Sequence, residues 1–175
     1  MNLVNLDEIT RRYMLQEIDG DVRAGRLYLS KRFSEKGRQD YEALLREATQ
    51  NHDAQWLAEQ LNTGGRMRAA EVSHSKRGTA FVKRTPLGDH ETTAFGEFNR
   101  YYIRGLCARA VDEGIKEVIV YRALDVTQER ASSAQLIGSS VDAATLLADL
   151  RDSIGTGTRM GIPSGPNSGI SVKLP

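Results

Sequence analysis

Cysteine, histidine and long apolar runs are scarce in this chain of 175 residues, and each scarcity excludes a class of protein. The one cysteine, Cys107, can form neither an intramolecular disulfide nor a cysteine-built zinc site. The three histidines lie too far apart in sequence for a local metal-ligand motif. No apolar run reaches the roughly 18 residues that a membrane span needs, and the first residues lack a signal-peptide pattern. We therefore expect a cytoplasmic-type protein with no metal, no cofactor and no membrane partner.

Net charge is also small, because 24 Lys and Arg residues face 23 Asp and Glu residues, for a total of +1. This balance excludes a strongly basic, histone-like binder. The charge is unevenly distributed, however: residues 1–62 and 85–175 each carry −2, whereas residues 63–84 carry +5. The basic side chains of this middle segment are Arg66, Arg68, Lys76, Arg77, Lys83 and Arg84.

Apolar periodicity predicts a mainly helical chain. Residues 1–62 contain three helices in this prediction, with Asp7 or Asn5, Ser34 and Asp53 at their beginnings. A long central helix begins at Thr92 or Thr93 and ends near Glu113, before Gly114. A last amphipathic helix covers about 143–154.

Two kinds of β-structure are expected. Residues 117–124 are β-branched and apolar, and the alternating segment 169–174 is expected to pair with them. Residues 68–74 and 79–84 flank a glycine-containing turn and predict a hairpin, which has too few apolar residues to be stable alone. The predicted fold is α+β: mainly helical, with a long central helix, a small sheet and a protruding basic hairpin. Residues 1–62 and 89–175 form one compact unit, and residues 63–88 form the arm.

Catalytic motifs are missing from the sequence. There is no Gly-x-Ser-x-Gly elbow, and the glycine-rich stretch 155–161 follows a helix and lacks the Lys-Ser/Thr of a phosphate loop. Cys107 lies among apolar helical neighbours, which favours a buried and unreactive thiol. We therefore predict no catalytic residue and no small-molecule substrate.

The long helix nevertheless carries a polar face that allows three interpretations. Glu97, Arg100, Tyr101 and Arg104 are neighbours at helical spacing. They form a solvated face, an interface with a partner subunit, or a catalytic acid with an arginine clamp. Arg122, in an apolar strand, needs a partner or an edge position, and its role stays open.

The basic hairpin also has alternative interpretations. Six positive charges in about twenty residues favour contact with nucleic-acid phosphates or with an acidic surface of a neighbour. Phe81 is the one aromatic residue of the segment, so a stacking platform for single strands is missing. A hairpin that is merely solvated is the remaining alternative.

Several stretches resemble a family of small structural proteins of tailed bacteriophages and prophages. They are FGEFNRYYIRGLCARA at 95–110, VIVYRA at 118–123 and GPNSGISVKL at 165–174, with LYLS at 27–30 and LLREA at 44–48. The resemblance implies a virion component of the head or neck, without enzymatic activity, that is found in the host cytoplasm during assembly. It supplies no catalytic residues.

These observations predict a non-enzymatic structural subunit of a phage virion, associated with the head or the head–tail junction. It is expected to bind other virion subunits, as a homo- or hetero-oligomer, through the basic hairpin and an extended C-terminal tail. The alternative is a DNA-binding accessory protein that acts through residues 66–84. A third hypothesis, an enzyme built around Glu97, Arg100 and Arg122, requires Glu97 to lie in a concave pocket with a shifted pKa.

Overall fold

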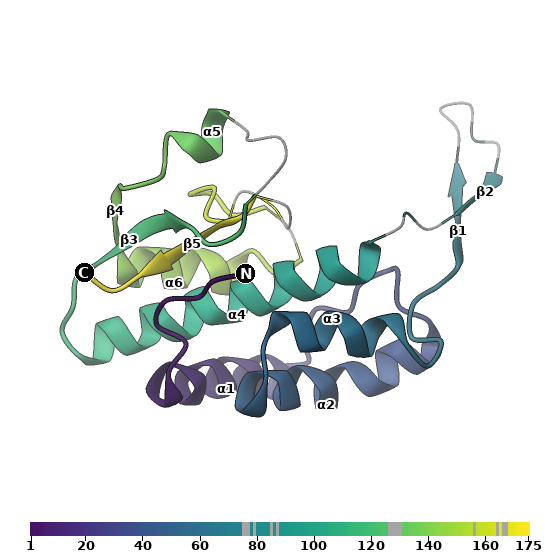
Figure 1. The fold of residues 1–175 in the computed structure, drawn as a ribbon, viewed down its shortest axis with the longest axis horizontal. Coiled ribbons are helices and arrows are strands. Elements are labelled where there is room, and N and C mark those ends of the chain that lie inside the picture. Colours follow the sequence, from purple (N-terminus) through teal and green to yellow (C-terminus); the bar gives the residue numbers. More distant parts are fainter. Residues whose placement is uncertain are drawn as a thin grey trace.

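The fold is α+β and mainly helical, as predicted from the sequence. In the computed structural model, the long helix α4 runs through the middle of the molecule, and the helical and β-containing parts lie on opposite sides of it (Figure 1). The structure describes residues 1–74, 78, 80–84, 86, 88–125, 131–155, 157–163, 165 and 168–175, with backbone alone for 71–74, 81–84 and 132.

Three helices form the N-terminal part, and each begins at a residue that caps it. Helices α1 (Glu8–Arg23), α2 (Glu35–Asn51) and α3 (Ala54–Asn62) follow one another along the chain. The side chains of Asp7, Ser34 and Asp53 each accept a hydrogen bond from a backbone N–H of the first turn, which satisfies one of the donors a helix leaves open. Ser34 is thus confirmed as a cap, Asp7 rather than its alternative Asn5 caps the first helix, and the third helix begins at Asp53 as predicted.

Helix α4 (Asp89–Asp112) begins earlier than predicted. Its N-cap is Gly88, at φ 85°, rather than a threonine, and Thr93 is buried inside the helix. The prediction failed because the first turn is held by a long-range contact: Arg32 Nη1 donates to Asp89 Oδ1 at 2.5 Å. At the other end Gly114 adopts φ 74° and the Ile115 N–H donates to the Ala110 carbonyl, which confirms the predicted stop.

A three-stranded antiparallel sheet lies on the other side of α4. Its order is β4–β3–β5, with β3 (Glu117–Arg122) between β4 (Ser140–Asp142) and β5 (Ile170–Lys173). The predicted pairing of β3 with the C-terminal segment is confirmed by the register Val120↔Val172. Strand β4, between the short helix α5 (Ala131–Ala134) and helix α6 (Ala143–Asp152), was not predicted.

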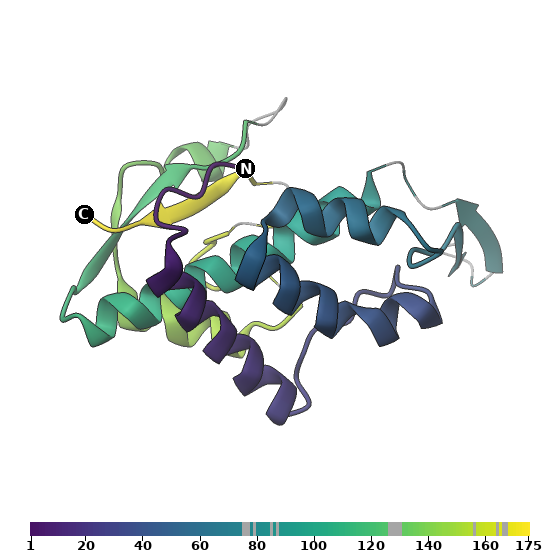
Figure 2. The same ribbon diagram turned by 60° about the horizontal axis from the view of Figure 1, so that its bottom comes forward.

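The C-terminal segment is folded against its own chain. Strand β5 is buried, the Leu174 N–H donates to Asn5 Oδ1, and Asn99 of α4 donates to the Ile170 carbonyl. The N-terminal segment crosses the same region, where the Asn2 N–H donates to the Ala123 carbonyl (Figure 2). Residues 170–173 therefore form the predicted strand of the core sheet, and contact of the rest of the tail with neighbouring subunits stays a prediction.

The hydrophobic core surrounds α4, which packs on α1, α3, α6 and the sheet. Phe98, Tyr102 and Leu106 are fully buried along its length. Cys107 is buried among them, as predicted, and burial raises the pKa of its thiol to about 12. Among the described residues, no helix combines the length and the apolar character that a membrane span requires.

Gly105 allows α1 and α4 to approach closely. A Cβ atom at this position would lie 2.6 Å from Met14 Cγ and 2.7 Å from the Met14 backbone nitrogen. Since a backbone atom cannot move aside cheaply, we expect Gly105→Ala to lower the free energy of unfolding by about 1–3 kcal/mol in urea denaturation. Gly20→Ala is the matched control, because nothing lies within 4 Å of a Cβ at Gly20 in α1. It is expected to be neutral or stabilising. Equal effects of the two substitutions would contradict this packing.

The hairpin consists of β1 (Ala70–His74) and β2 (Ala80–Arg84), paired antiparallel with Val72 opposite Val82. It projects from the end of the molecule near the beginning of α4 (Figure 1). The two strands pack against each other, and neither packs extensively on another helix or strand of the described chain. The predicted hairpin and its position outside the core are both observed.

Candidate functional site

The basic residues at the base of the arm contact their own chain. Arg66 donates from Nε to Asp40 Oδ2 at 2.7 Å and from Nη1 to the Gln60 carbonyl at 2.8 Å. Arg68 donates from Nε to the Phe33 carbonyl at 2.9 Å. Arg66 and Arg68 therefore hold the arm in place, and contact of either residue with a partner stays a prediction.

The backbone at the arm's base is fixed as well. The Ser34 N–H donates to the Arg66 carbonyl at 2.9 Å, and Met67 pairs with Phe33 in an isolated antiparallel bridge. Gly37 makes the close approach possible, because a Cβ there would lie 2.1 Å from the Arg66 carbonyl oxygen. The arm thus leaves the molecule from a fixed point beside the N-terminus of α2.

The other four basic residues belong to the hairpin itself. Lys83 and Arg84 are on β2, where the register places them opposite Glu71 and Ala70, and their side chains are not described. Lys76 and Arg77 lie outside the described residues. Residues 70–84 contain these four cations and one acidic residue, so the net charge of the hairpin is +3 by sequence.

The predicted helix-face interface is largely inside the molecule. Arg100 is 8% exposed, and Tyr101 and Arg104 are each 2% exposed. Arg100 donates to the Ser153 carbonyl at 2.7 Å. The interpretation of these residues as a solvated or partner-facing surface is therefore wrong for Arg100, Tyr101 and Arg104, which are buried. Glu97 is partly exposed and lines a cleft.

Arg104 is the centre of a buried charge cluster that joins α1 to α4. Its Nε and Nη2 donate to Glu17 Oε2 at 3.0 and 2.8 Å, and its Nη1 donates to Asp21 Oδ2 at 2.5 Å. The Tyr101 hydroxyl donates to the same Asp21 oxygen at 2.9 Å, and Arg151 of α6 also pairs with Glu17. Burial by itself raises the pKa of Glu17, but the hydrogen bonds and charges of Arg151 and Arg104 outweigh it, and the pKa is lowered. The cluster is structural.

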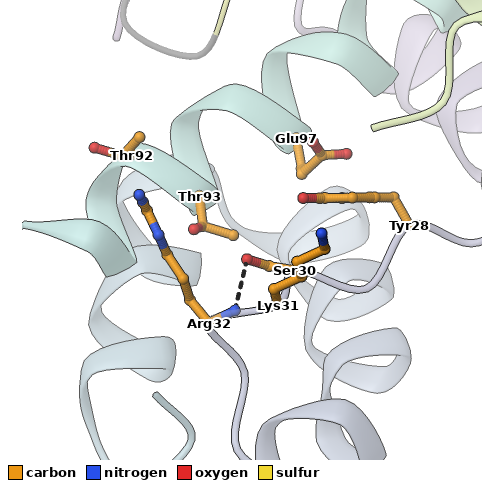
Figure 3. A pocket seen from close by; sticks show the side chains of 7 residues that line it. All are labelled: Tyr28, Ser30, Lys31, Arg32, Thr92, Thr93 and Glu97. Carbon is orange, nitrogen blue, oxygen red and sulfur yellow. Dashed lines mark hydrogen bonds between the residues drawn. The ribbon is translucent and has the colours of Figure 1, made fainter. Parts of the chain in front are cut away.

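Glu97 lies in a cleft of 330 Å³ between α4 and the segment that connects α1 to α2. Figure 3 shows the Tyr28 side chain extending into this cleft beside Glu97, with its hydroxyl directed toward Ser30 and Thr93. Its lining combines a carboxyl, cations and hydroxyls with apolar surface. The lining residues are Tyr28, Ser30, Lys31, Arg32, Thr92, Thr93 and Glu97.

Burial of Glu97 changes its acidity. Loss of hydration raises its pKa to about 7, against the lowering effect of Arg100 and Arg104, while nearby Asp21 raises it further. No hydrogen bond or ion pair joins the Glu97 carboxyl to a described residue. A half-buried carboxyl in a concave pocket with a shifted pKa is the condition set by the enzyme hypothesis.

A second cleft of 200 Å³ shares part of this lining. Tyr28 and Glu97 line it together with Arg100 and Gly155. A Cβ at Gly155 would lie 2.4 Å from Tyr28 Cδ2, so the glycine leaves space for the tyrosine ring. Buried Asp149 fixes the neighbouring chain by accepting from the Met160 N–H at 2.8 Å and the Arg159 N–H at 3.0 Å.

Arg122 does not line either cleft. It donates from Nη1 to the Ser168 carbonyl at 2.6 Å and so joins β3 to the segment before β5. The structure therefore brings together Glu97 and Arg100 but not the third member of the hypothetical enzyme site. Within the described part of the chain, no cluster of three His, Cys, Asp or Glu residues is suited to a metal ion.

Comparison of this chain with protein-family models, with curated proteins and with solved structures found no match. Function must therefore be argued from the arm and the cleft themselves.

Proposed function

We propose that this protein is a non-enzymatic structural subunit that docks its basic hairpin arm onto a neighbouring subunit. The observation that carries the proposal is the projection of β1 and β2 from the body (Figure 1). Following the sequence resemblance, the assembly is a tailed-phage virion, and the subunit belongs to its head or neck. The body supplies a rigid platform, and the arm supplies the contact.

The physical reason is that an isolated two-stranded ribbon is marginally stable in water. Both outer edges of the ribbon leave backbone N–H and C=O groups unpaired in the described chain, which makes the ribbon a template for pairing. Contact with a second protein would bury the ribbon and satisfy an edge. The fixed base formed by Arg66 and Ser34 keeps the arm from folding back freely.

Charge complementarity favours another copy of this chain as a neighbour. The hairpin segment is basic, whereas the sequence on either side of it carries −2 and −2. An arm that docks on the body of the next copy forms a heterologous contact, which generates a ring when the rotation closes. Electrostatic attraction of this kind weakens as salt increases.

DNA binding through the same arm is the second candidate, and the excess of cations in residues 70–84 favours it. The two candidate partners, a neighbouring subunit and DNA, are distinguished by one variant that combines four substitutions: Lys76→Ala, Arg77→Ala, Lys83→Ala and Arg84→Ala. On our proposal it loses self-association in sedimentation equilibrium, while the wild type shows at most weak, non-specific DNA affinity in fluorescence anisotropy.

A control removes four exposed cations from the body instead, at Arg12, Arg23, Lys36 and Lys116, and is expected to retain self-association. If the wild type binds duplex DNA tightly with a steep salt dependence, and the arm variant alone abolishes it, DNA is the partner. Unchanged association of the arm variant would argue against docking through these charges.

A further inference from the structure

The three-stranded sheet has one edge that its own chain covers. At the outer edge of β5, the Ile170 carbonyl accepts a hydrogen bond from Asn99 Nδ2 at 2.9 Å. Just beyond the end of the same strand, the Leu174 N–H donates to Asn5 Oδ1 at 3.0 Å. Two asparagine side chains therefore occupy the place of a further strand. Covering an edge is one way in which proteins keep a sheet from pairing with another chain.

The outer edge of β4 has no such cover in the part of the chain that the structure describes. The Ser139 carbonyl and the Ala143 N–H both face β3, where each takes part in a hydrogen bond. Because hydrogen bonding alternates along an antiparallel strand, the backbone N–H and C=O of Ser140 point away from β3. Neither group makes a hydrogen bond with a described residue, and Ser140 is exposed.

An acidic pair lies at the same edge. The register places Glu117 of β3 directly opposite Asp142 of β4, and both residues are exposed. Neither makes an ion pair with a described residue. Hydrogen bonds from Thr145 lower the pKa of Asp142, so this carboxyl is ionised at neutral pH. Like charges directly opposite each other on a sheet repel, and a cation from outside would relieve the repulsion.

The basic arm and this acidic edge lie at opposite ends of the molecule. Figure 1 shows the hairpin beyond the beginning of α4, and β4 on the side toward the end of that helix. A helix of 24 residues is about 36 Å long. Strands of five residues span about 17 Å, so the arm cannot reach back to its own β4. A contact between arm and edge has to join two copies, head to tail.

We propose that β2 of one copy adds to the outer edge of β4 in the next copy and becomes a fourth strand of its sheet. Strand addition joins backbone to backbone, and it would use groups that the ribbon and β4 both leave unpaired. Charge selects β2, because β2 carries Lys83 and Arg84 by sequence whereas β1 carries Glu71. Repetition of the contact builds a ring or a filament. The inference rests on the proposed function and names the surface that receives the arm.

Sedimentation equilibrium of the full-length protein beside three charge variants tests the pairing. The reversed-arm variant combines Lys83→Glu with Arg84→Glu. The reversed-edge variant combines Glu117→Lys with Ser140→Lys and retains Asp142, which caps α6. Each is expected to weaken self-association at least about ten-fold, because like charges then face each other. The third variant carries all four substitutions and should associate more tightly than either of the others, since the charges are again opposite.

A proline substitution separates strand addition from a contact that is merely electrostatic. Ser140→Pro removes an outward N–H and no hydrogen bond to β3, a position at which edge strands tolerate proline. It should also weaken self-association at least about ten-fold, as the loss of a backbone pairing site requires. Glu8→Pro is the matched control, at the exposed first position of α1, where proline fits a helix. It should associate as the wild type does, and circular dichroism verifies that each variant is folded.

The outcomes distinguish this inference from the proposed function. Weak association of the reversed-arm variant, with unchanged association of the reversed-edge variant and of Ser140→Pro, overturns the inference and leaves docking of the arm in place. A variant with all four substitutions that associates no better than the other two also overturns the inference. Unchanged association of the reversed-arm variant, or a monomeric wild type, overturns both.

Discussion

Replacement of Arg104 by methionine is expected to lower the free energy of unfolding by about 3–5 kcal/mol, because it removes the cation buried between the carboxylates of Glu17 and Asp21. Glu17 is 6% exposed and Asp21 is 1% exposed, so water cannot replace the lost guanidinium. Methionine retains much of the apolar volume, which separates loss of charge from loss of packing. Urea denaturation at pH 7, monitored by the single tryptophan and by circular dichroism, measures the change.

Arg109→Met is the matched control, since Arg109 is another arginine of α4 with two carboxylate partners. Those partners, Asp7 and Glu113, are 50% and 38% exposed, and exposed pairs contribute about 1 kcal/mol or less. The control should therefore lose about 1 kcal/mol or less. A loss below 1 kcal/mol for Arg104→Met, or equal losses for the two variants, would show that the buried cluster is not a main support of the fold.

Glu97→Gln is expected to stabilise the protein at pH 8 by on the order of 2–3 kcal/mol, and much less at pH 4.5, because the wild-type carboxyl loses hydration on folding. Its pKa rises from 4.5 in the unfolded chain to about 7 in the fold. Below pH 4.5 the group is protonated in both states. Between these values the unfolded chain releases a proton that the folded chain keeps, so the contribution of Glu97 to stability falls as the pH rises to about 7 and is then constant.

The difference in unfolding free energy between wild type and Glu97→Gln should therefore grow from pH 4.5 to pH 7 and stay level above it. Glu117→Gln, at an exposed position of β3, is the control and should leave the pH dependence as it is in the wild type. A difference that does not change with pH would mean that Glu97 is hydrated in the folded protein as it is in the unfolded chain.

A carboxyl that destabilises the fold is retained where it contributes to function. Glutamine at position 97 would keep the shape of the side chain without the cost of its charge. Stabilising substitutions at binding sites commonly reduce function for this reason. We therefore expect Glu97→Gln to be the more stable protein.

The sequence predicted those parts of the fold that local chemistry determines. Ser34 was predicted as a helix cap, and Asp7 (with Asn5 as the alternative) and Asp53 as helix starts, because a short polar side chain there can accept a hydrogen bond from the first turn. Gly114 was recognised as a helix end for the same kind of reason. The pairing of β3 with β5 followed from their apolar patterns, since two strands need a shared buried face.

Features that depend on distant partners were missed or misread. Arg104 and Tyr101 looked like a surface because nothing in α4 shows that Glu17 and Asp21 of α1 face them. The start of α4 was misplaced because Arg32, far away in sequence, holds Asp89. Helical spacing identifies which side chains share a face, but the neighbouring element decides whether that face is buried.

The cleft illustrates the same limit at a candidate site. Glu97 was singled out from the sequence, and Arg100 accompanies it, but Tyr28 and Lys31 were not, because they come from a connecting segment about seventy residues earlier. Arg122 was grouped with Glu97 and Arg100 by residue type alone. In the structure it donates a hydrogen bond to the Ser168 carbonyl instead. The cleft could therefore not be expected from the sequence, because the tertiary fold forms it.

The most direct test of the proposed function is the molar mass of the purified protein by light scattering after size exclusion, beside a variant in which a short Gly-Ser linker replaces residues 70–84. Because the hairpin packs on little else, the variant should keep the circular dichroism spectrum and the melting temperature of the wild type apart from the loss of two strands. The account predicts an oligomer for the wild type that dissociates as salt or dilution increases, and a monomer for the variant under all conditions. A monomeric wild type, or an oligomer that persists without the arm, would contradict assembly through the hairpin.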